Sequence, residues 1–337
     1  MVAEILSTHT PELFQKAVRR AAELLRAGEV VALPTETVYG LAANALDEKA
    51  VAKIFQIKGR PSHNPIIVHV AGNAMAHDCV KEFTLLAEKF SNAFWPGPLT
   101  LVLPRAKKIP DSVTAGGETI GVRWPSHPFM QAVIRECGFP LAAPSANLSN
   151  QISPTNVEHV RAQLGSKISL IVDGGQSQVG IESTVLDLTV SPPRILRPGM
   201  IHAESLTAVA GEVQSPKSIV QGETARKSPG LLKKHYSPKA KLVVLYWRDE
   251  ADLRLQVSSL KFQIPDCHVI AHTQIPADES FADVSVMPHD AEAFARALYA
   301  ELHRCDQAGA RLIIVEAPPA DLPEWFGIMD RLQRAAA

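Results

Sequence analysis

The spacing of apolar positions along the first two-thirds of the chain predicts short strands interleaved with helices. Runs of apolar and β-branched residues are typical of strands, and apolar residues that recur three or four positions apart are typical of helices. The expected strands are residues 30–33, 66–70, 99–103, 120–123, 170–173 and 185–188, and the expected helices are residues 48–57, 85–94, 128–137 and 157–164. Because some strands follow one another as hairpins and others are separated by helices, we expect an α/β or α+β layer fold with a twisted mixed sheet.

The first helix has recognisable signals at both of its ends. Thr10 is an N-cap residue, Pro11 follows it in the first helical turn, and Gly28 ends the pattern. We therefore expect a helix between Thr10 and Gly28.

A change of composition between residues 211 and 239 predicts the domain boundary. This stretch is rich in Ser, Pro, Gly, Gln and Lys and has few periodic apolar positions, which is typical of a linker. Strands expected at residues 242–247, 268–272 and 312–316, with a helix at residues 291–304, predict a small doubly wound parallel sheet. We thus expect one domain over residues 1–210, a linker over 211–239 and a second domain over 240–337.

Composition narrows the class of protein further. The chain has 337 residues, 46% of them hydrophobic, which is enough for about two domains. Its 34 basic residues nearly balance 35 acidic ones, so there is no global positive field of the kind that non-specific nucleic-acid binders use. Any anion site must therefore be a local concentration of positive charge.

Cysteine spacing and hydropathy indicate the compartment. Cys79, Cys137, Cys267 and Cys305 lack the close pairing of zinc or redox sites, so we expect free, buried thiols. The N-terminus lacks a long apolar run after a basic start, and no stretch approaches the ~20 apolar residues of a membrane span. These features predict a cytoplasmic protein.

Several common catalytic motifs are missing. The sequence lacks the phosphate-binding P-loop, the dinucleotide fingerprint, the Gly-x-Ser-x-Gly elbow and the His-Glu-x-x-His zinc helix. The absence of these motifs argues against the usual nucleotide-binding and hydrolase classes.

Two polar runs stand beside expected strands early in the chain. The run Pro-Thr-Glu-Thr-Val-Tyr-Gly-Leu over residues 34–41 offers hydroxyls to an anion or a substrate hydroxyl, or forms a Thr-rich turn. In the run over residues 58–65, Lys58 and Arg60 flank a glycine, with Asn64 and His69 close behind, which is typical of a polyphosphate clamp. The attraction of a helix C-terminus for cations explains Lys58 but not the rest.

Further polar residues follow later strands. Arg123 ends an expected strand and is suited to hold a carboxylate, although a solvated strand-end arginine has the same pattern. The Ala-Pro-Ser-Ala-Asn passage around Ser145 and Asn147 combines small residues with hydroxyls and an amide, as phosphate sites do. We interpret the run over residues 94–100, which contains Trp-Pro-Gly-Pro, as structural.

These runs share one design. Small residues, hydroxyls and cations lie at strand ends, without a pair of carboxylates. Such a site suits an anionic substrate with an anionic leaving group and indicates phosphoryl or nucleotidyl transfer rather than hydrolysis.

The order of the runs resembles the Sua5/YrdC/YwlC family of threonylcarbamoyl-AMP synthases. The match spans about the first two-thirds of the chain, and the linker and second α/β domain resemble the longer, Sua5-type branch. The resemblance implies a YrdC-like twisted mixed sheet with helices, followed by a smaller, Rossmann-like parallel sheet. It also implies condensation of L-threonine, bicarbonate and ATP to threonylcarbamoyl-AMP, with release of pyrophosphate. The product would then serve a separate transferase that modifies tRNA to threonylcarbamoyladenosine.

The resemblance also implies roles for individual residues. The polar catalytic core would be Lys58, Arg60, Ser145 and Asn147. The L-threonine pocket would be Thr37, His69, Arg123, Ala143 and Ser183. ATP would contact Arg60, Asn64, Thr119, Ser145, Ser153, Arg197 and, from the linker, Tyr236.

Three questions remain open at this stage. We expect no protein metal site, with magnesium arriving on the nucleotide and Asp173 and Glu182 as the nearest candidates otherwise. The linker around Tyr236, including Lys233 and Lys234, either folds over the nucleotide as a lid or is an ordinary exposed connection. The competing functions are a non-catalytic RNA-binding module, which the neutral overall charge disfavours, and a carbamoyl-adenylate-forming maturation enzyme. A weak contact with tRNA is a further expectation.

Overall fold

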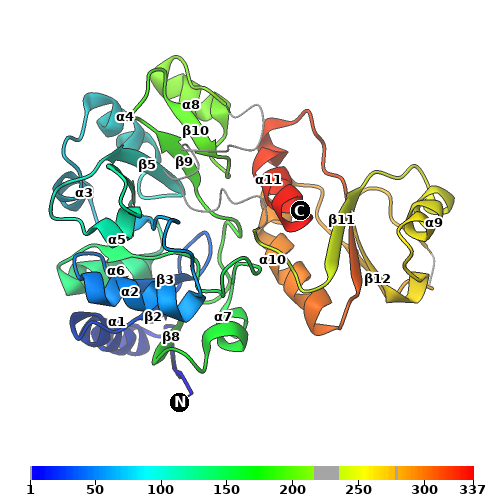
Figure 1. The fold of residues 1–337 in the computed structure, drawn as a ribbon, viewed down its shortest axis with the longest axis horizontal. Coiled ribbons are helices and arrows are strands. Elements are labelled where there is room, and N and C mark those ends of the chain that lie inside the picture. Colours follow the sequence, from blue (N-terminus) through cyan, green and yellow to red (C-terminus); the bar gives the residue numbers. More distant parts are fainter. Residues whose placement is uncertain (1, 216–234, 278–279) are drawn as a thin grey trace. The chain divides into compact units, whose positions relative to one another are not determined.

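One mixed sheet organises the first of the two units into which the chain divides. The computed structural model describes residues 2–215, 235–277 and 280–337, of which residues 2–149 and 153–215 form the first unit. Figure 1 shows this unit in blue to green. In order across the sheet, its strands are β1 (Glu4–Ser7), β8 (Leu170–Asp173), β2 (Val31–Leu33), β3 (Gly40–Asn44), β7 (Leu141–Ala142), β4 (Val68–His69), β6 (Thr119–Arg123), β5 (Leu99–Pro104), β9 (Thr184–Asp187) and β10 (Arg194–Arg197).

Alternate residues of these strands face two separate cores. Val31 and Leu33 belong to one apolar cluster and Ala32 to the other, because successive side chains of a strand point to opposite faces. The described helices that cover the sheet are α1 (Pro11–Arg26), α2 (Glu48–Lys58), α3 (Asn73–Cys79), α4 (Leu85–Phe94), α5 (Asp111–Thr114), α6 (Pro128–Cys137), α7 (Val157–Leu164) and α8 (Ala203–Ala210). Buried residues of α1 and α6 share one cluster, while those of α2, α4 and α7 belong to the other.

Capping residues set the helix ends as the sequence predicts. The Thr10 side chain accepts a hydrogen bond from the Leu13 N–H at the start of α1. Helix α2 ends where Gly59 adopts φ 61°, a left-handed conformation that favours glycine. This abrupt end directs the chain from Lys58 into the polar run that follows.

The second unit is a smaller parallel sheet with helices on both faces. It comprises residues 150–152, 235–277 and 280–337. Its strands are, in spatial order, β11 (Lys241–Leu245), β14 (Leu312–Glu316), β12 (Cys267–Ala271) and β13 (Asp283–Val286), and all neighbours are parallel. Figure 1 shows α9 (Glu250–Ser259) on one side of this sheet and α10 (Ala291–Gln307) and α11 (Phe326–Ala335) on the other.

The fold class expected from the sequence is confirmed for both sheets. The four cysteines are free and buried, also as expected. One expected strand is shorter than predicted. Of residues 66–70 only Val68–His69 forms a regular strand, and the Ile66 N–H donates to the carbonyl of Val113 in α5. Throughout the described part of the chain, no helix has the length and apolar character needed to cross a bilayer.

Candidate functional site

Neighbouring strand ends place several of the predicted residues at one edge of the large sheet. His69 ends β4 and Arg123 ends β6, and the two residues are direct partners in a parallel register. Strand β5 runs antiparallel to β6 and parallel to β9, so both β5 and β9 begin at this same edge. Ser183 immediately precedes β9, and it therefore lies at this edge as well.

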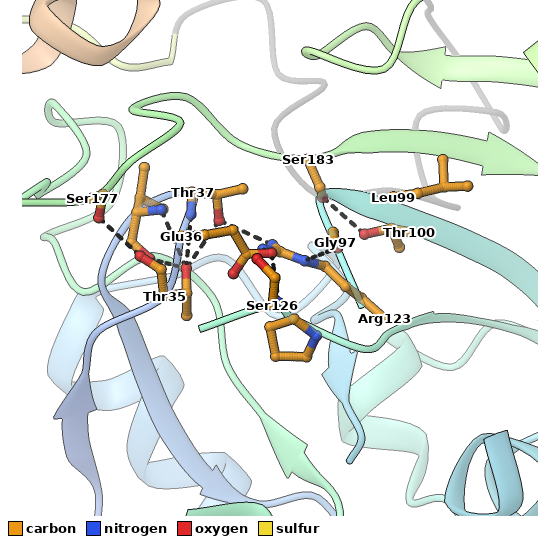
Figure 2. A network of polar contacts seen from close by, with 12 residues as sticks. Thr35, Glu36, Thr37, Gly97, Leu99, Thr100, Arg123, Ser126, Ser177 and Ser183 are labelled. Carbon is orange, nitrogen blue, oxygen red and sulfur yellow. Dashed lines mark hydrogen bonds and ion pairs between the residues drawn. The ribbon is translucent and has the colours of Figure 1, made fainter. Parts of the chain in front are cut away.

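Arg123 is buried and held from three directions. Its Nε donates to the Gly97 carbonyl at 3.2 Å, and its Nη1 donates to the Thr37 hydroxyl at 2.9 Å. Its Nη2 lies 2.6 Å from the Glu36 Oε1, so the cation is paired with a buried carboxylate. Figure 2 shows these partners converging on the guanidinium from separate segments of the chain.

The Gly97 carbonyl reaches Arg123 because residue 97 has no side chain. A Cβ atom there would lie 2.4 Å from the Phe94 carbonyl oxygen, which no side chain tolerates. The Trp-Pro-Gly-Pro run is therefore structural as expected, and it also orients the arginine.

The Glu36 carboxylate is ionised in this environment. Burial acts to raise its pKa, but the charge of Arg123 and the Ser126 N–H, which donates to Oε1 at 3.0 Å, together hold the pKa below the usual 4.5. The sequence motifs assign Glu36 no role. It is the only carboxylate in the run over residues 34–41, and this is the feature of the sequence that could have marked it as a site residue.

His69 is neutral at physiological pH. Burial, followed by the nearby charge of Arg123, lowers its pKa to about 3. Its Nδ1 is buried and has no hydrogen-bond partner among the described residues, and the same holds for Glu36 Oε2. Buried polar atoms without partners are uncommon, so these two indicate a place where a ligand could bind.

Ser183 is oriented by two neighbours. Its hydroxyl lies 2.8 Å from the Thr100 hydroxyl, and the Arg197 Nη2 donates to it at 3.1 Å. The Arg197 Nε also donates to the Ser183 carbonyl at 3.1 Å. Thr100 is fully buried and was not predicted as a site residue, because it belongs to the run interpreted as structural.

Ala143 and Thr37 complete the predicted threonine set. Ala143 follows β7, and its N–H donates to the Ile67 carbonyl at 3.1 Å. Thr37 lies in the turn between β2 and β3, where its hydroxyl is 3.0 Å from that of Thr35. The predicted Thr-rich turn is thus present, and it also contacts Arg123.

Lys58 holds the Ser-Ala-Asn loop. Its Nζ donates to the carbonyls of Ser145 and Asn147 at 2.5 Å and 2.6 Å, and to the Asn147 Oδ1 at 3.1 Å. The Ser145 hydroxyl donates to the same Oδ1 at 2.5 Å. Burial and the charge of Arg60 lower the Lys58 pKa well below 10.5. Three of the four residues of the expected polar core therefore form one hydrogen-bonded unit.

Arg60 shapes the segment that follows α2. Its Nε donates to the Asn64 carbonyl at 3.0 Å and its Nη2 to the Pro65 carbonyl at 2.6 Å. The guanidinium thereby fixes the loop that carries Asn64, and both side chains are buried.

Two further residues of the predicted ATP set lie in different surroundings. The Ser153 hydroxyl donates to the Glu182 Oε1 at 2.5 Å. Thr119 begins β6, roughly 13 Å along the strand from Arg123, and lines a small pocket with Pro65 and Thr100. The predicted residues therefore do not all lie at the same end of the strands, and the ATP contact of Thr119 stays a prediction.

Tyr236 belongs to the second unit. Its φ is 61°, its ring is buried, and the Arg331 Cζ lies 5.3 Å from the ring centroid. Lys233 and Lys234, which the lid hypothesis includes, lie outside the described residues. The contact of Tyr236 with ATP stays a prediction.

The metal alternatives were Asp173 and Glu182. Asp173 accepts from the Gly175 N–H and Glu182 from Ser153. Within residues 2–215, 235–277 and 280–337, there is no group of three His, Cys, Asp or Glu side chains able to hold an ion.

Comparison with family models identifies both parts of the chain. A model named for Sua5, YciO and YrdC, described as telomere recombination, matches residues 23–199. A second model, described as the C-terminal domain of threonylcarbamoyl-AMP synthase, matches residues 201–337.

Individual proteins match almost the whole chain. A protein of Pyrococcus abyssi named threonylcarbamoyl-AMP synthase is 39% identical over 95% of this chain and 94% of its own length. A Bacillus subtilis protein of the same name is 42% identical over 99% of this chain and 96% of its own length. The crystal structure of P. abyssi Sua5 complexed with L-threonine superposes with a TM-score of 0.90 at 35% identity, covering 100% of this chain and 98% of that one. The resemblance read from the motifs is confirmed, and the chain belongs to the Sua5/YciO/YrdC family of enzymes.

Proposed function

We propose that this enzyme condenses L-threonine, bicarbonate and ATP to threonylcarbamoyl-AMP and releases pyrophosphate. Two relatives that span nearly all of the chain are named threonylcarbamoyl-AMP synthase, and a similar solved structure holds L-threonine. The observation that carries the proposal is the buried Arg123 at the end of β6, next to polar atoms of Glu36 and His69 that have no hydrogen-bond partner among the described residues.

The amino-acid pocket in this proposal is the group around Arg123. Arg123 would hold the threonine carboxylate, because a guanidinium matches a carboxylate with parallel hydrogen bonds. Thr37, His69, Ser183 and the backbone at Ala143 would surround the rest of the amino acid. Since His69 is neutral, it would act as a hydrogen-bonding group rather than as a charge.

The nucleotide would lie along the neighbouring loops. We assign ATP contacts to Arg60, Asn64, Thr119, Ser145, Ser153 and Arg197, with Tyr236 as a further candidate from the second unit. Lys58 and Arg60 would offset charge that develops at phosphorus, and the hydrogen bonds of Lys58 to residues 145 and 147 would keep that loop in place.

The bond changes follow from the substrates. The threonine ammonium group loses a proton to solvent, and its nitrogen then forms a bond to the bicarbonate carbon with loss of water, which gives a carbamate. A carbamate oxygen then attacks the α-phosphorus, and the bond to the β,γ-phosphates breaks with pyrophosphate as the leaving group. The carbamate oxygen is already anionic, so its attack on phosphorus needs no side chain as general base. The protein supplies position and positive charge.

Magnesium would be held by the nucleotide phosphates in this scheme. The described residues offer separate carboxylates rather than a cage, which suits an ion that keeps most of its ligands from phosphate and water.

The product would pass to a separate transferase that modifies tRNA to threonylcarbamoyladenosine. Because ATP and tRNA substrates are cytoplasmic, we propose that compartment for the reaction.

Pyrophosphate release from ATP tests this proposal. The purified protein is given L-threonine and bicarbonate together, singly, or not at all. We expect release only with both, and with L-serine as the matched control we expect slower turnover, since one methyl group is worth about 1–3 kcal/mol. Release without either substrate, or no release at all, would contradict the proposal.

A further inference from the structure

Glu36 lies inside the amino-acid pocket of the proposed function, although neither the sequence motifs nor the proposed contacts give it a role. It is only 5% exposed, and it lies between the hydroxyl-bearing residues Thr35 and Thr37. Figure 2 shows its carboxylate directed towards Arg123 and Ser126. One oxygen, Oε1, makes both contacts, with the Arg123 Nη2 at 2.6 Å and the Ser126 N–H at 3.0 Å.

This contact helps to fix the direction in which Arg123 points. Each nitrogen of the guanidinium has its own partner: Nε contacts the Gly97 carbonyl, Nη1 the Thr37 hydroxyl and Nη2 the Glu36 carboxylate. A guanidinium has five N–H donors, so these three partners leave donors on Nη1 and Nη2 for a ligand. Removing one partner would let the planar group rotate away from the ligand.

The charge of the pair bears on which ligand can enter. An isolated buried cation attracts any anion, and the proposed reaction contains bicarbonate, ATP and pyrophosphate. Glu36 cancels the charge of Arg123, while His69 contributes none. A pocket with one buried cation and one buried anion matches an amino-acid zwitterion, and it gives a simple anion little net attraction.

The second Glu36 oxygen supports this match. Oε2 is buried and has no hydrogen-bond partner within the described part of the chain. An ionised carboxylate accepts hydrogen bonds only, so the oxygen suits an N–H or O–H group of a ligand rather than its carboxylate.

We propose that Glu36 is a positioning and specificity-determining residue of the amino-acid pocket. It holds Arg123 in one direction and balances its charge, so that the pocket selects a zwitterionic amino acid over inorganic anions. This inference rests on the proposed function, because it takes the group around Arg123 as the threonine pocket.

The test uses Glu36→Gln, which keeps the shape of the side chain and removes its charge. The matched control is Glu29→Gln, which removes a carboxylate from an exposed ion pair with Lys53 in the same unit. Initial rates of pyrophosphate release are measured against threonine at saturating ATP, and against ATP at saturating threonine, with and without sulfate.

We expect Glu36→Gln to raise the threonine KM by roughly tenfold, with the ATP KM changed by less than about twofold. Sulfate should become a competitive inhibitor against threonine in this variant, but not in the wild type or in Glu29→Gln. Glu36→Asp keeps the charge, so it should again be insensitive to sulfate. A merely structural role would change both KM values alike and give no competition by sulfate, whatever the melting temperature, and that result overturns the proposal.

A failure of the proposed reaction is distinguishable from a failure of this inference. If the wild type releases no pyrophosphate, calorimetry with L-threonine and with sodium sulfate replaces the kinetic assay. Threonine binding that weakens in Glu36→Gln while sulfate binding appears would support the inference. Equal binding in both proteins, or no threonine binding by the wild type, would overturn it.

Discussion

Two buried glutamates, one in each unit, show how different the surroundings of a carboxylate can be. Glu316 ends β14, and its two oxygens accept hydrogen bonds from the backbone N–H groups of residues 272–274 and from the Thr273 hydroxyl. Glu36 has one oxygen engaged by Arg123 and Ser126, and the other has no partner among the described residues. Both oxygens of Glu316 have hydrogen-bond donors within their own unit. The Oε2 atom of Glu36 can still accept a hydrogen bond from a ligand.

The difference separates a structural carboxylate from one placed in a binding site. The pKa of Glu316 is lowered from 4.5 because the hydrogen bonds from Thr273 and His272 outweigh the effect of burial. The pKa of Glu36 is lowered as well, but here the charge of Arg123 is the main effect that opposes burial. Arg123 is the residue to which we assign the threonine carboxylate. A change at Glu316 should therefore affect stability alone, and a change at the Glu36–Arg123 pair should affect both stability and ligand binding.

The largest effect is expected from Arg123→Ala. It leaves the Glu36 charge buried and unpaired, which should lower the free energy of unfolding by about 3–5 kcal/mol. It should also lower kcat/KM for threonine by roughly 100-fold, through loss of the carboxylate contact. Chemical denaturation and pyrophosphate release measure the two effects.

The matched control for that variant is Arg20→Ala. Arg20 is an exposed arginine of the same unit, with ion pairs to Glu4 and Glu23. Its removal should leave kcat/KM unchanged. An equal loss of activity in the two variants would show that Arg123 has no special place in the pocket.

Glu316→Gln is expected to give the next largest effect. A glutamine directs part of its amide towards N–H donors, so the C-terminal unit should lose about 2–4 kcal/mol of stability. The KM for threonine should stay within about twofold of the wild-type value. Hydrogen exchange at β12 and β14 reports the stability, and Glu292→Gln, at an exposed position of α10, is the control.

The stability of the first unit should depend on pH through His69 and Glu36. The folded-state pKa of His69 is about 3 against an ordinary 6.5, so between these values only the unfolded chain takes up the proton. Stability should therefore fall as the pH drops below 6.5, by up to about 1.4 kcal/mol per pH unit. The lowered pKa of Glu36 acts later: its contribution is present above 4.5 and is lost as the pH falls through its folded value.

A variant separates the two titrations. His69→Asn should flatten the slope between pH 6.5 and 4.5 and leave the loss at lower pH in place. Thermal unfolding across this range measures it, and an unchanged slope would mean that His69 takes up its proton in the folded protein as readily as in the unfolded one.

The smallest effect is expected from Glu29→Gln. Glu29 and Lys53 form an exposed ion pair at 2.8 Å, and such pairs contribute about 0–1 kcal/mol. Stability should change by less than about 0.5 kcal/mol and the threonine KM should not change. A larger loss of stability, measured by chemical denaturation, would contradict the expected difference between buried and exposed carboxylates.

The sequence predicted the long helices and the sheet type well, because capping residues and apolar spacing are local signals. Helices α4, α6 and α7 begin and end where the pattern indicated. Strand β3 was not predicted as a strand, since Gly40–Asn44 contains no β-branched residue and is extended only through pairing with β2 and β7.

Site residues were predictable where a motif carried them and not where distant segments meet. Lys58 and Asn147 were both selected, but the hydrogen bonds that join them span 89 positions of sequence. The Glu36–Arg123 pair likewise connects two runs that the motifs treated separately. Thr100 was passed over because nothing local shows that its hydroxyl meets Ser183.

The most direct test of the account is mass spectrometry of the adenylate formed from L-threonine, ¹³C-bicarbonate and ATP. We predict a threonylcarbamoyl-AMP species that carries the carbon label, forms with the wild type and is almost lost with Arg123→Ala. Formation of AMP or ADP alone, or an adenylate without the label, would contradict the proposed reaction and the pocket assigned to it.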